Sequence, residues 1–264
     1  LLAAFFYAGA VLPLFYLPFL VLREPSAQRD AARYAASSGA DSKRLAFRKS
    51  VGAMLHNQAF VIMTATGLFY WGITALVQAA LPYVVTEICL LSVSDTMVFY
   101  IPGILASLAC YPLVTWLAGK VGKWRVFSGS LLAASLVLPG LMVIGEWIPL
   151  PLKVQGIAWV TLQAIAMSGV TMLPPAFGAE IVDHDAELTG QRREGVYYAA
   201  WGLFDQAVNG VVAGLLPLLL LLGRSHSDPN GPLGVRMIGV FGGGLMFIAF
   251  LIFQRYPFRR QQGA

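Results

Sequence analysis

Long apolar runs alternate with short polar connections along the whole chain. A helix needs about 20 residues to cross a hydrocarbon layer roughly 30 Å thick. Runs of that length lie near residues 1–22, 59–80, 96–118, 126–145, 152–174, 195–222 and 234–254. The first run ends at Leu22-Arg23-Glu24 instead of a small-residue cleavage site and has no basic segment before it, so it reads as a spanning helix and not as a signal peptide. The pattern predicts seven spanning helices.

The composition places these helices in a bilayer. Hydrophobic residues make up 58% of the chain and charged residues only 12%, which is too little polar surface to cover a water-soluble globule of this size. We therefore expect an all-α, polytopic membrane protein with the lipid bilayer as its surroundings.

The basic residues show how the helices are oriented. When alternate connections are assigned to opposite sides, 15 of the 18 Lys and Arg residues fall on one side, and only Lys153, Arg224 and Arg236 fall on the other. The positive-inside tendency makes the first side cytoplasmic, so we expect the N-terminus outside and the C-terminus inside a cell membrane, the plasma or inner membrane. These charges are not grouped with exposed aromatic residues, so we expect no nucleic-acid partner.

A compact charged segment, PPAFGAEIVDHDAELTGQRREG at residues 174–195, joins two of the apolar runs. It resembles the signature between the tenth and eleventh helices of the glycoside-pentoside-hexuronide:cation symporters, the melibiose-permease-like branch of the major facilitator superfamily. The matching residues, in order, are Asp183, Asp185, Glu187, Thr189, Gly190, Arg192, Arg193, Glu194 and Gly195. The segment WLAGKVGKWR at residues 116–125 is similar to the turn between the eighth and ninth helices of that superfamily, and Gly122 would permit its tight reversal.

The resemblance implies how the chain is divided. Residues 1–22 would be the last helix of a missing N-terminal bundle, 23–58 a central cytoplasmic loop, 59–258 a second six-helix bundle and 259–264 a cytoplasmic tail. The first residue is not Met and lies inside an apolar run, which favours a fragment of a twelve-helix transporter. The alternative is a seven-helix protein with an outside N-terminus, whose helix count and orientation also permit a receptor-like fold.

Charges in the 174–195 segment suggest a gate. Ion pairs that form only when the cytoplasmic side closes would bias a two-state equilibrium, and the resemblance implicates this region in a cytoplasmic gate. The candidate gate residues are Asp183, Asp185, Glu187, Arg192, Arg193 and Glu194. The alternative is a solvated loop with local helix caps.

Asp205 is the only acid deep within a predicted span, about ten residues or roughly 15 Å from Gly195. A carboxylate near the midplane costs free energy and marks a functional site by default. Tyr198, Trp201, Asp205 and Asn209 follow i, i+3, i+7 and i+11 spacing and share one helical arc. That arc suits a polyhydroxylated ligand, because sugar faces stack on aromatic rings while acid and amide bond hydroxyls. The alternative is an arc that packs on a neighbouring helix with Asp205 protonated.

One position departs from the family. After Asp205, where many relatives carry a lysine that links the cation and sugar sites, this chain has Gln206. A neutral amide does not supply that charge, so melibiose-type sodium coupling is in doubt and we offer proton coupling through Asp205 as a hypothesis. No cofactor is expected beyond the coupling cation, H⁺ or Na⁺.

Further polar or aromatic candidates for a cavity are Tyr70, Trp71, Gln78, Trp159 and Gln163. Cys89 and Cys110 have no metal-ligand spacing, and we expect no metal site. Gly210 and Gly214, like Gly239 and Gly243, have the spacing of close helix contacts.

Together these features predict a secondary transporter that takes up a small-molecule substrate, a sugar or glycoside, with a cation by alternating access between this bundle and the missing one. Two alternatives stay open. One is a lipid or lysolipid carrier of the same fold, and the other is a non-transporting membrane sensor or accessory protein. We expect no enzyme, because the sequence carries no nucleophile triad, phosphate loop or metal motif.

Overall fold

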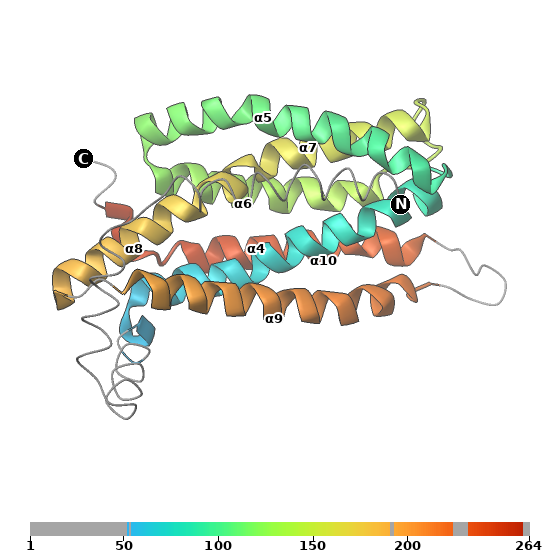
Figure 1. Cartoon of the computed structure of the whole chain (residues 1–264). Helices are drawn as coiled ribbons and strands as arrows, with labels where there is room; N and C mark the ends of the chain where they lie inside the picture. Colours follow the sequence, from blue (N-terminus) through green and yellow to red (C-terminus); the bar gives the residue numbers. More distant parts are fainter. Residues whose placement is uncertain (1–51, 53, 191–192, 224–231, 261–264) are drawn as a thin grey trace, which may run out of the picture. The chain divides into compact units, whose positions relative to one another are not determined.

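The computed structural model describes residues 52, 54–190, 193–223 and 232–260, and six long helical runs make up this described part of the chain (Figure 1). Each run is long and apolar enough to cross a membrane, and the described residues contain no strand. With labels as in Figure 1, the runs are α4 (Gln58–Tyr83) with the π-helical η1 (Val84–Ile88); the 3₁₀ turn η2 (Val93–Asp95) with α5 (Thr96–Val121); α6 (Lys123–Val137) with the 3₁₀ turn η3 (Leu138–Met142); α7 (Leu152–Met172) with α8 (Pro174–Thr189); α9 (Glu194–Leu220); and α10 (Leu233–Phe253), followed by η4 (Pro257–Arg260).

The predicted all-α class and six of the seven predicted spans are confirmed, with ends that shift by a few residues. The predicted helix 1–22, most of the 23–58 loop and the last residues of the tail lie outside the described residues. The predicted division into a loop, a bundle and a tail therefore stays a prediction.

The charged 174–195 segment, expected as a connection between two apolar runs, is mostly helical. Residues Pro174–Thr189 form α8, which follows α7 after a single non-helical residue, Leu173. Pro174 and Pro175 occupy the first helical positions, where a missing N–H costs no hydrogen bond, and α8 ends at Gly190 with a left-handed φ of 66°. The charged segment therefore lies on a helix that extends the α7 run.

Local signals set the other helix ends. The Asn57 side chain caps α4 by accepting hydrogen bonds from the backbone N–H groups of Ala59 and Phe60 at 3.1 and 3.3 Å. Gly122 separates α5 from α6 with a φ of 92°, a conformation that favours glycine. The tight reversal predicted at Gly122 is confirmed.

The helices pack in an order that differs from their order along the chain. α5 contacts α7, α7 contacts α6, and α6 contacts α10 (Figure 1). α4 contacts both α10 and α9. Thus α4 is held by α10 and α9, whereas α5 is held by α7. This arrangement leaves a gap between α4 and the α5–α7 pair.

An aromatic cluster locks α6, α8 and α10 together at one end of the bundle. Phe127 of α6 stacks edge-on against Phe253 of α10, with ring centroids 4.6 Å apart, and against Phe177 of α8 at 5.3 Å. Tyr256 adds a ring 5.4 Å from Phe177. All four rings are fully buried, so the base of α8 is fixed to the bundle.

Two pairs of glycines behave differently. At Gly239 and Gly243, α10 approaches η3 so closely that a Cβ at Gly239 would collide with the Leu138 carbonyl oxygen, and one at Gly243 would lie 2.6 Å from Pro139 Cγ. These two confirm the predicted close contact. Gly210 and Gly214 of α9 face space with no described neighbour, so their predicted contact is not made within the described bundle.

Large apolar side chains stay uncovered on α5 and α9. Leu203 of α9 is 73% exposed and Met97 of α5 is 71% exposed. Lipid tails are as apolar as leucine, so such faces carry no penalty in a bilayer. Both helices are therefore suited to lie against lipid or another apolar surface.

Candidate functional site

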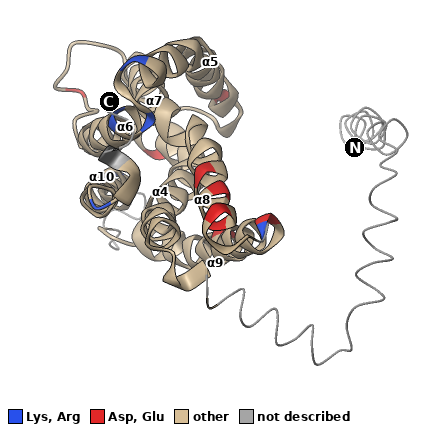
Figure 2. Ribbon diagram, turned by 90° about the vertical axis from the view of Figure 1, so that its left-hand side faces the viewer, with Lys and Arg blue, Asp and Glu red and all other residues tan. Residues whose placement is uncertain are grey.

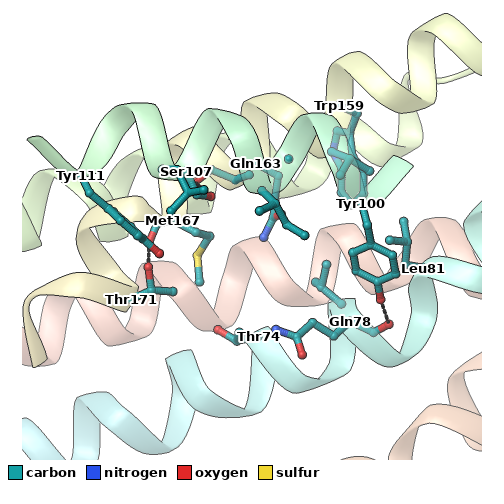
Figure 3. A pocket seen from close by; sticks show the side chains of 16 residues that line it. Thr74, Gln78, Leu81, Tyr100, Ser107, Tyr111, Trp159, Gln163, Met167 and Thr171 are labelled. Atoms are coloured by element: carbon teal, nitrogen blue, oxygen red, sulfur yellow. Dashed lines mark hydrogen bonds between the residues drawn. The ribbon is translucent and has the colours of Figure 1, made fainter. Parts of the chain in front are cut away.

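The gap between α4 and the α5–α7 pair contains a cavity of about 260 Å³ (Figure 3). Its wall mixes amides, hydroxyls and aromatic rings with small apolar side chains. The lining residues are Thr74, Val77, Gln78 and Leu81 of α4; Tyr100, Gly103, Ile104, Ser107, Leu108 and Tyr111 of α5; and Trp159, Val160, Gln163, Ala164, Met167 and Thr171 of α7.

Two amides supply the hydrogen-bonding capacity of this first cavity. The side chains of Gln78 and Gln163 extend into the gap from opposite walls (Figure 3). Neither amide bonds another described residue, whereas the Tyr100 hydroxyl donates to the Gln78 backbone carbonyl at 3.3 Å and Ser107 Oγ donates to the Ala164 carbonyl at 3.5 Å. An amide offers two donors and an acceptor, so these two side chains suit a ligand with several hydroxyls.

A second cavity, of about 400 Å³, lies between α4, the junction of α7 with α8, and α9. Four aromatic rings contribute to it: Tyr70 and Trp71 have centroids 5.3 Å apart, and Tyr198 and Trp201 have centroids 5.5 Å apart. The remaining lining residues are Met63, Thr74, Val170, Thr171, Pro174 and Pro175. The wall is thus mainly aromatic and apolar.

Few polar atoms in the second cavity are available to a ligand. Trp201 Nε1 already donates to Thr64 Oγ1 at 2.9 Å. The Tyr70 hydroxyl is buried and has no hydrogen-bond partner among the described residues, although the Asp205 carboxylate lies close enough to interact with it electrostatically. This hydroxyl is fully buried, so the Tyr70 ring and not its hydroxyl forms the part of the wall that a ligand would meet.

The two cavities adjoin each other, because Thr74 and Thr171 line both. Thr74 Oγ1 donates to the Tyr70 carbonyl at 2.6 Å, and Thr171 Oγ1 donates to the Ser168 carbonyl at 3.1 Å. Both hydroxyls keep lone pairs that can accept a hydrogen bond. Together the cavities form one elongated site with an amide-lined part and an aromatic part.

The structure brings most of the predicted cavity residues into this site. Tyr70, Trp71, Tyr198 and Trp201 line the second cavity, and Gln78, Trp159 and Gln163 line the first. The predicted arc on α9 is divided between two roles, since Tyr198 and Trp201 line a cavity and the rest of the arc does not.

Asp205, Gln206 and Asn209 lie further along α9 and line neither cavity. Asp205 is half-buried, and Asn209 Nδ2 donates to its carbonyl at 3.0 Å and lies 3.4 Å from its Oδ2. Gln206 is exposed. Among the described residues, Asp205 is related to the aromatic cavity through its electrostatic interaction with Tyr70.

Sequence reasoning missed the α5 wall. Tyr100, Ser107 and Tyr111 follow i, i+7 and i+11 spacing, which places them on one arc of α5. The same spacing had singled out the α9 residues. The α5 arc was not predicted as part of a site because, unlike the α9 arc, it contains no acidic residue.

The charged end of the bundle holds a polar groove of about 400 Å³ along α8. Figure 2 shows the acidic residues of α8 as a series of red segments along its ribbon. Glu180 and Lys123 line the groove and form an ion pair, with Nζ and Oε2 3.1 Å apart. The predicted gate residues Asp183 and Glu187 are exposed and also line it. The gate prediction did not include the Lys123–Glu180 pair.

The remaining gate candidates occupy different environments. Asp185 is only 5% exposed and faces the bundle, where its Oδ2 has no hydrogen-bond partner among the described residues. The expectation that Asp185 lies on a charged surface loop is wrong, because α8 turns this position inward. Arg193 and Glu194 lie at the start of α9, and Arg192 lies outside the described residues.

Beside this groove, Tyr256 is almost completely buried. Burial raises the pKa of its hydroxyl well above the usual range, and the nearby Glu180 carboxylate raises it further. Tyr256 therefore stays neutral at physiological pH. Among the described residues, no group of His, Cys, Asp and Glu could hold a metal ion.

Comparison with known proteins identifies the family. Residues 1–257 match the family described as MFS/sugar transport protein. The match agrees with the melibiose-permease-like resemblance of the 174–195 segment. The searches of curated proteins and of solved structures found no match.

Proposed function

Because the chain belongs to the MFS/sugar transport protein family, we propose that its six described helices form the second bundle of a cation-coupled sugar transporter. The partner would be an N-terminal bundle, with alternating access produced by rocking of the two bundles about a shared site. In this proposal the groove along α8 faces the cytoplasm and the C-terminus lies inside the cell.

One observation carries the proposal: the two adjoining cavities on the open side of the bundle. Gln163 is twelfth of the 21 residues of α7, and Ser107 is twelfth of the 26 residues of α5, so the amide-lined cavity lies near the middle of both helices. Secondary transporters bind their substrates at this depth. Amides that bond hydroxyls and rings that stack on sugar faces are the groups that sugar binding requires.

Coupling by protons is supported by Asp205. Its carboxyl lies within a spanning helix, close enough to interact electrostatically with Tyr70 of the aromatic cavity. An ionisable side chain inside a membrane span is costly and marks an ion or proton pathway. Gln206 supplies no cation next to it, which favours H⁺ over Na⁺.

Uptake in vesicles tests both parts. The complete protein would be reconstituted in proteoliposomes and supplied with a panel of radiolabelled hexosides and pentosides under an inward H⁺ gradient, an inward Na⁺ gradient or no gradient. We expect accumulation of at least one sugar, driven by the H⁺ gradient. Asp205→Asn should abolish gradient-driven accumulation but retain exchange of the sugar across the membrane. Glu146→Gln, in the connection between η3 and α7, is the matched control.

The outcomes separate the candidates. Accumulation driven equally well by Na⁺ alone, or unaltered in Asp205→Asn, would contradict proton coupling through Asp205. Uptake of lysolipids with no sugar uptake would favour a lipid carrier. Absence of any gradient-dependent uptake would favour a sensor or accessory protein.

A second proposal concerns the closed state of the charged end. Glu180 is already neutralised by Lys123, whereas Asp183 and Glu187 stay exposed in the groove. We assign these two carboxylates, together with Arg192, Arg193 and Glu194, to pairs that form when the cytoplasmic side closes. Asp185 would act differently, by holding α8 against the bundle from its buried side.

A further inference from the structure

We propose that an anionic phospholipid binds on the exposed side of α5, with its phosphate held by Lys120 and Arg125 and an acyl chain lying along the helix. This surface is separate from the two cavities, and its occupant does not depend on what the protein transports. The proposal follows from an uncovered apolar stripe that ends at two cations.

The stripe consists of apolar residues at intervals of three and four, which places them on one side of the helix. All of them are exposed: Leu105, Ala109, Pro112, Leu113, Trp116 and Leu117. The next position at this spacing is Lys120, which is the one charged residue of α5. The stripe is therefore apolar along most of the helix and cationic at its end.

The stripe faces away from the amide-lined cavity. Ser107 lines that cavity, and Trp116 follows Ser107 by nine residues. At about 3.6 residues per turn, this spacing places Trp116 roughly half a turn around the helix from the cavity wall. A second bundle that closes over the cavity would therefore leave this side of α5 to the lipid.

Local contacts hold both cations at the end of the stripe. Lys120 Nζ lies 4.1 Å from the ring centroid of Trp116, one helical turn earlier, in a cation–π contact. Arg125 Nη1 donates to the Val121 carbonyl at 3.4 Å, which brings the guanidinium to the last turn of α5. Tryptophan and basic side chains at the end of a spanning helix are typical of the membrane–water interface, where lipid headgroups lie.

The charge of these two cations favours an anionic headgroup. Within the described part of the chain, ion pairs neutralise Lys123 and Lys153, whereas no described acid pairs with Lys120 or Arg125. A guanidinium has five N–H donors, so Arg125 keeps donors for a phosphate after it bonds Val121. A phosphatidylcholine headgroup would bring its own cation to this place, so a headgroup of net negative charge is preferred.

Quenching of tryptophan fluorescence tests the proposal. The complete protein would be reconstituted in phosphatidylcholine vesicles that contain increasing amounts of phosphatidylglycerol or phosphatidylcholine with brominated acyl chains, which quench nearby tryptophan. Subtraction of the signal of the Trp116→Phe protein isolates the quenching of Trp116. We expect brominated phosphatidylglycerol to bind beside Trp116 about 25-fold more tightly than brominated phosphatidylcholine, because each of two basic side chains near an anionic surface contributes about fivefold.

Variants assign the preference to the two cations. Lys120→Gln and Arg125→Gln should each reduce the preference to about fivefold, and the double variant should abolish it. Lys120→Arg keeps the charge and should keep the preference. Lys153→Gln is the matched control, because Lys153 pairs with Asp95 at the opposite end of α5, and it should leave the quenching of Trp116 unchanged.

Four results would contradict the proposal. Equal quenching of Trp116 by both brominated lipids would show that the headgroup is not recognised. A preference that persists in the double variant would exclude Lys120 and Arg125 as its source. Absence of quenching by either lipid would show that protein covers the stripe. Loss of the preference on addition of inorganic phosphate would show that the cations bind free phosphate instead of a phospholipid.

Discussion

Trp201 of α9 donates its indole N–H to the hydroxyl of Thr64 on α4, with Nε1 and Oγ1 2.9 Å apart. The bond joins two helices that also meet through apolar contacts, such as that of Val208 with Gly72. It also orients one of the four rings of the aromatic cavity. The wall of the candidate site is thus held by a hydrogen bond between the buried Thr64 and the partly buried Trp201.

Replacement of Thr64 by valine should destabilise the protein by about 1 kcal/mol, because the Trp201 N–H loses its acceptor while the volume is kept. Thermal unfolding of the purified protein in detergent measures the change. Thr66→Val is the matched control, since Thr66 Oγ1 bonds the Ile62 carbonyl of its own helix and no neighbour loses a partner. If both variants lose the same stability, the bond between helices contributes nothing of its own.

Gly239→Ala should lower the free energy of unfolding by about 1–3 kcal/mol, because the added methyl group would collide with backbone of η3. Gly244→Ala on the same helix meets no atom within 4 Å and should be neutral or slightly stabilising, since alanine favours helix. Comparison of the melting temperatures of the two variants in the same detergent tests this difference in stability. A Gly239→Ala protein as stable as Gly244→Ala would show that α10 and η3 can separate freely.

Loss of the Lys123–Glu180 ion pair should cost less than about 1 kcal/mol, because both side chains are partly exposed and solvent screens the pair. Glu180→Gln should therefore lower the melting temperature slightly in low salt, and the difference should shrink at high salt. The exchanged pair Lys123→Glu with Glu180→Lys should recover part of the loss. Asp183→Asn, at an exposed acid of the same groove, is the control; an equal effect there would point to overall charge instead of the pair.

Cys89 should react slowly with N-ethylmaleimide at pH 7.5. Burial raises the pKa of its thiol to about 11, and only the thiolate is nucleophilic. The variant Cys110→Ala leaves Cys89 as the one thiol, so mass spectrometry can follow its labelling with pH. The rate should rise steeply up to about pH 11, and denatured protein should react with the rate of a free cysteine. Rapid labelling of the folded protein at pH 7.5 would contradict the buried position.

The same pKa shift has a consequence for stability. The neutral thiol of Cys89 is favoured in the folded state, so its contribution is complete below the ordinary cysteine pKa of about 8.5. The contribution is lost as the pH rises from there through about 11. Cys89→Ala should remove this part of the alkaline pH dependence.

Helical periodicity and apolar length were sufficient to predict the six described spans, because a bilayer admits only helices or closed barrels and the runs are too long for strands. The reversal at Gly122 was also predictable, because residues 116–125 resemble a known turn of the superfamily and glycine permits a tight reversal. The α8 helix was not predictable in this way. Its charges suggested a loop, but alanine, glutamate and leucine are strong helix formers and the proline pair sits where a helix tolerates it.

The site was predicted in part. Trp201 and Tyr198 were found because they share an arc with an acid, and Tyr70 and Trp71 because they are aromatic within a span. The other residues of the candidate site depend on the order in which the helices pack against one another. Which wall faces Gln163 depends on α4 lying beside α9 and α10 instead of α5, and no property of the single helices encodes that choice. For the same reason the sequence did not show that the two described cavities are lined without Asp205.

The α7–α8 run connects the two ends of the molecule mechanically. α7 carries Gln163 and Thr171 of the candidate site, and α8 carries the acids of the charged groove. Pro174 and Pro175 are the first residues of α8 and also part of the wall of the aromatic cavity. Any displacement of the start of α8 would therefore displace the cavity wall with it.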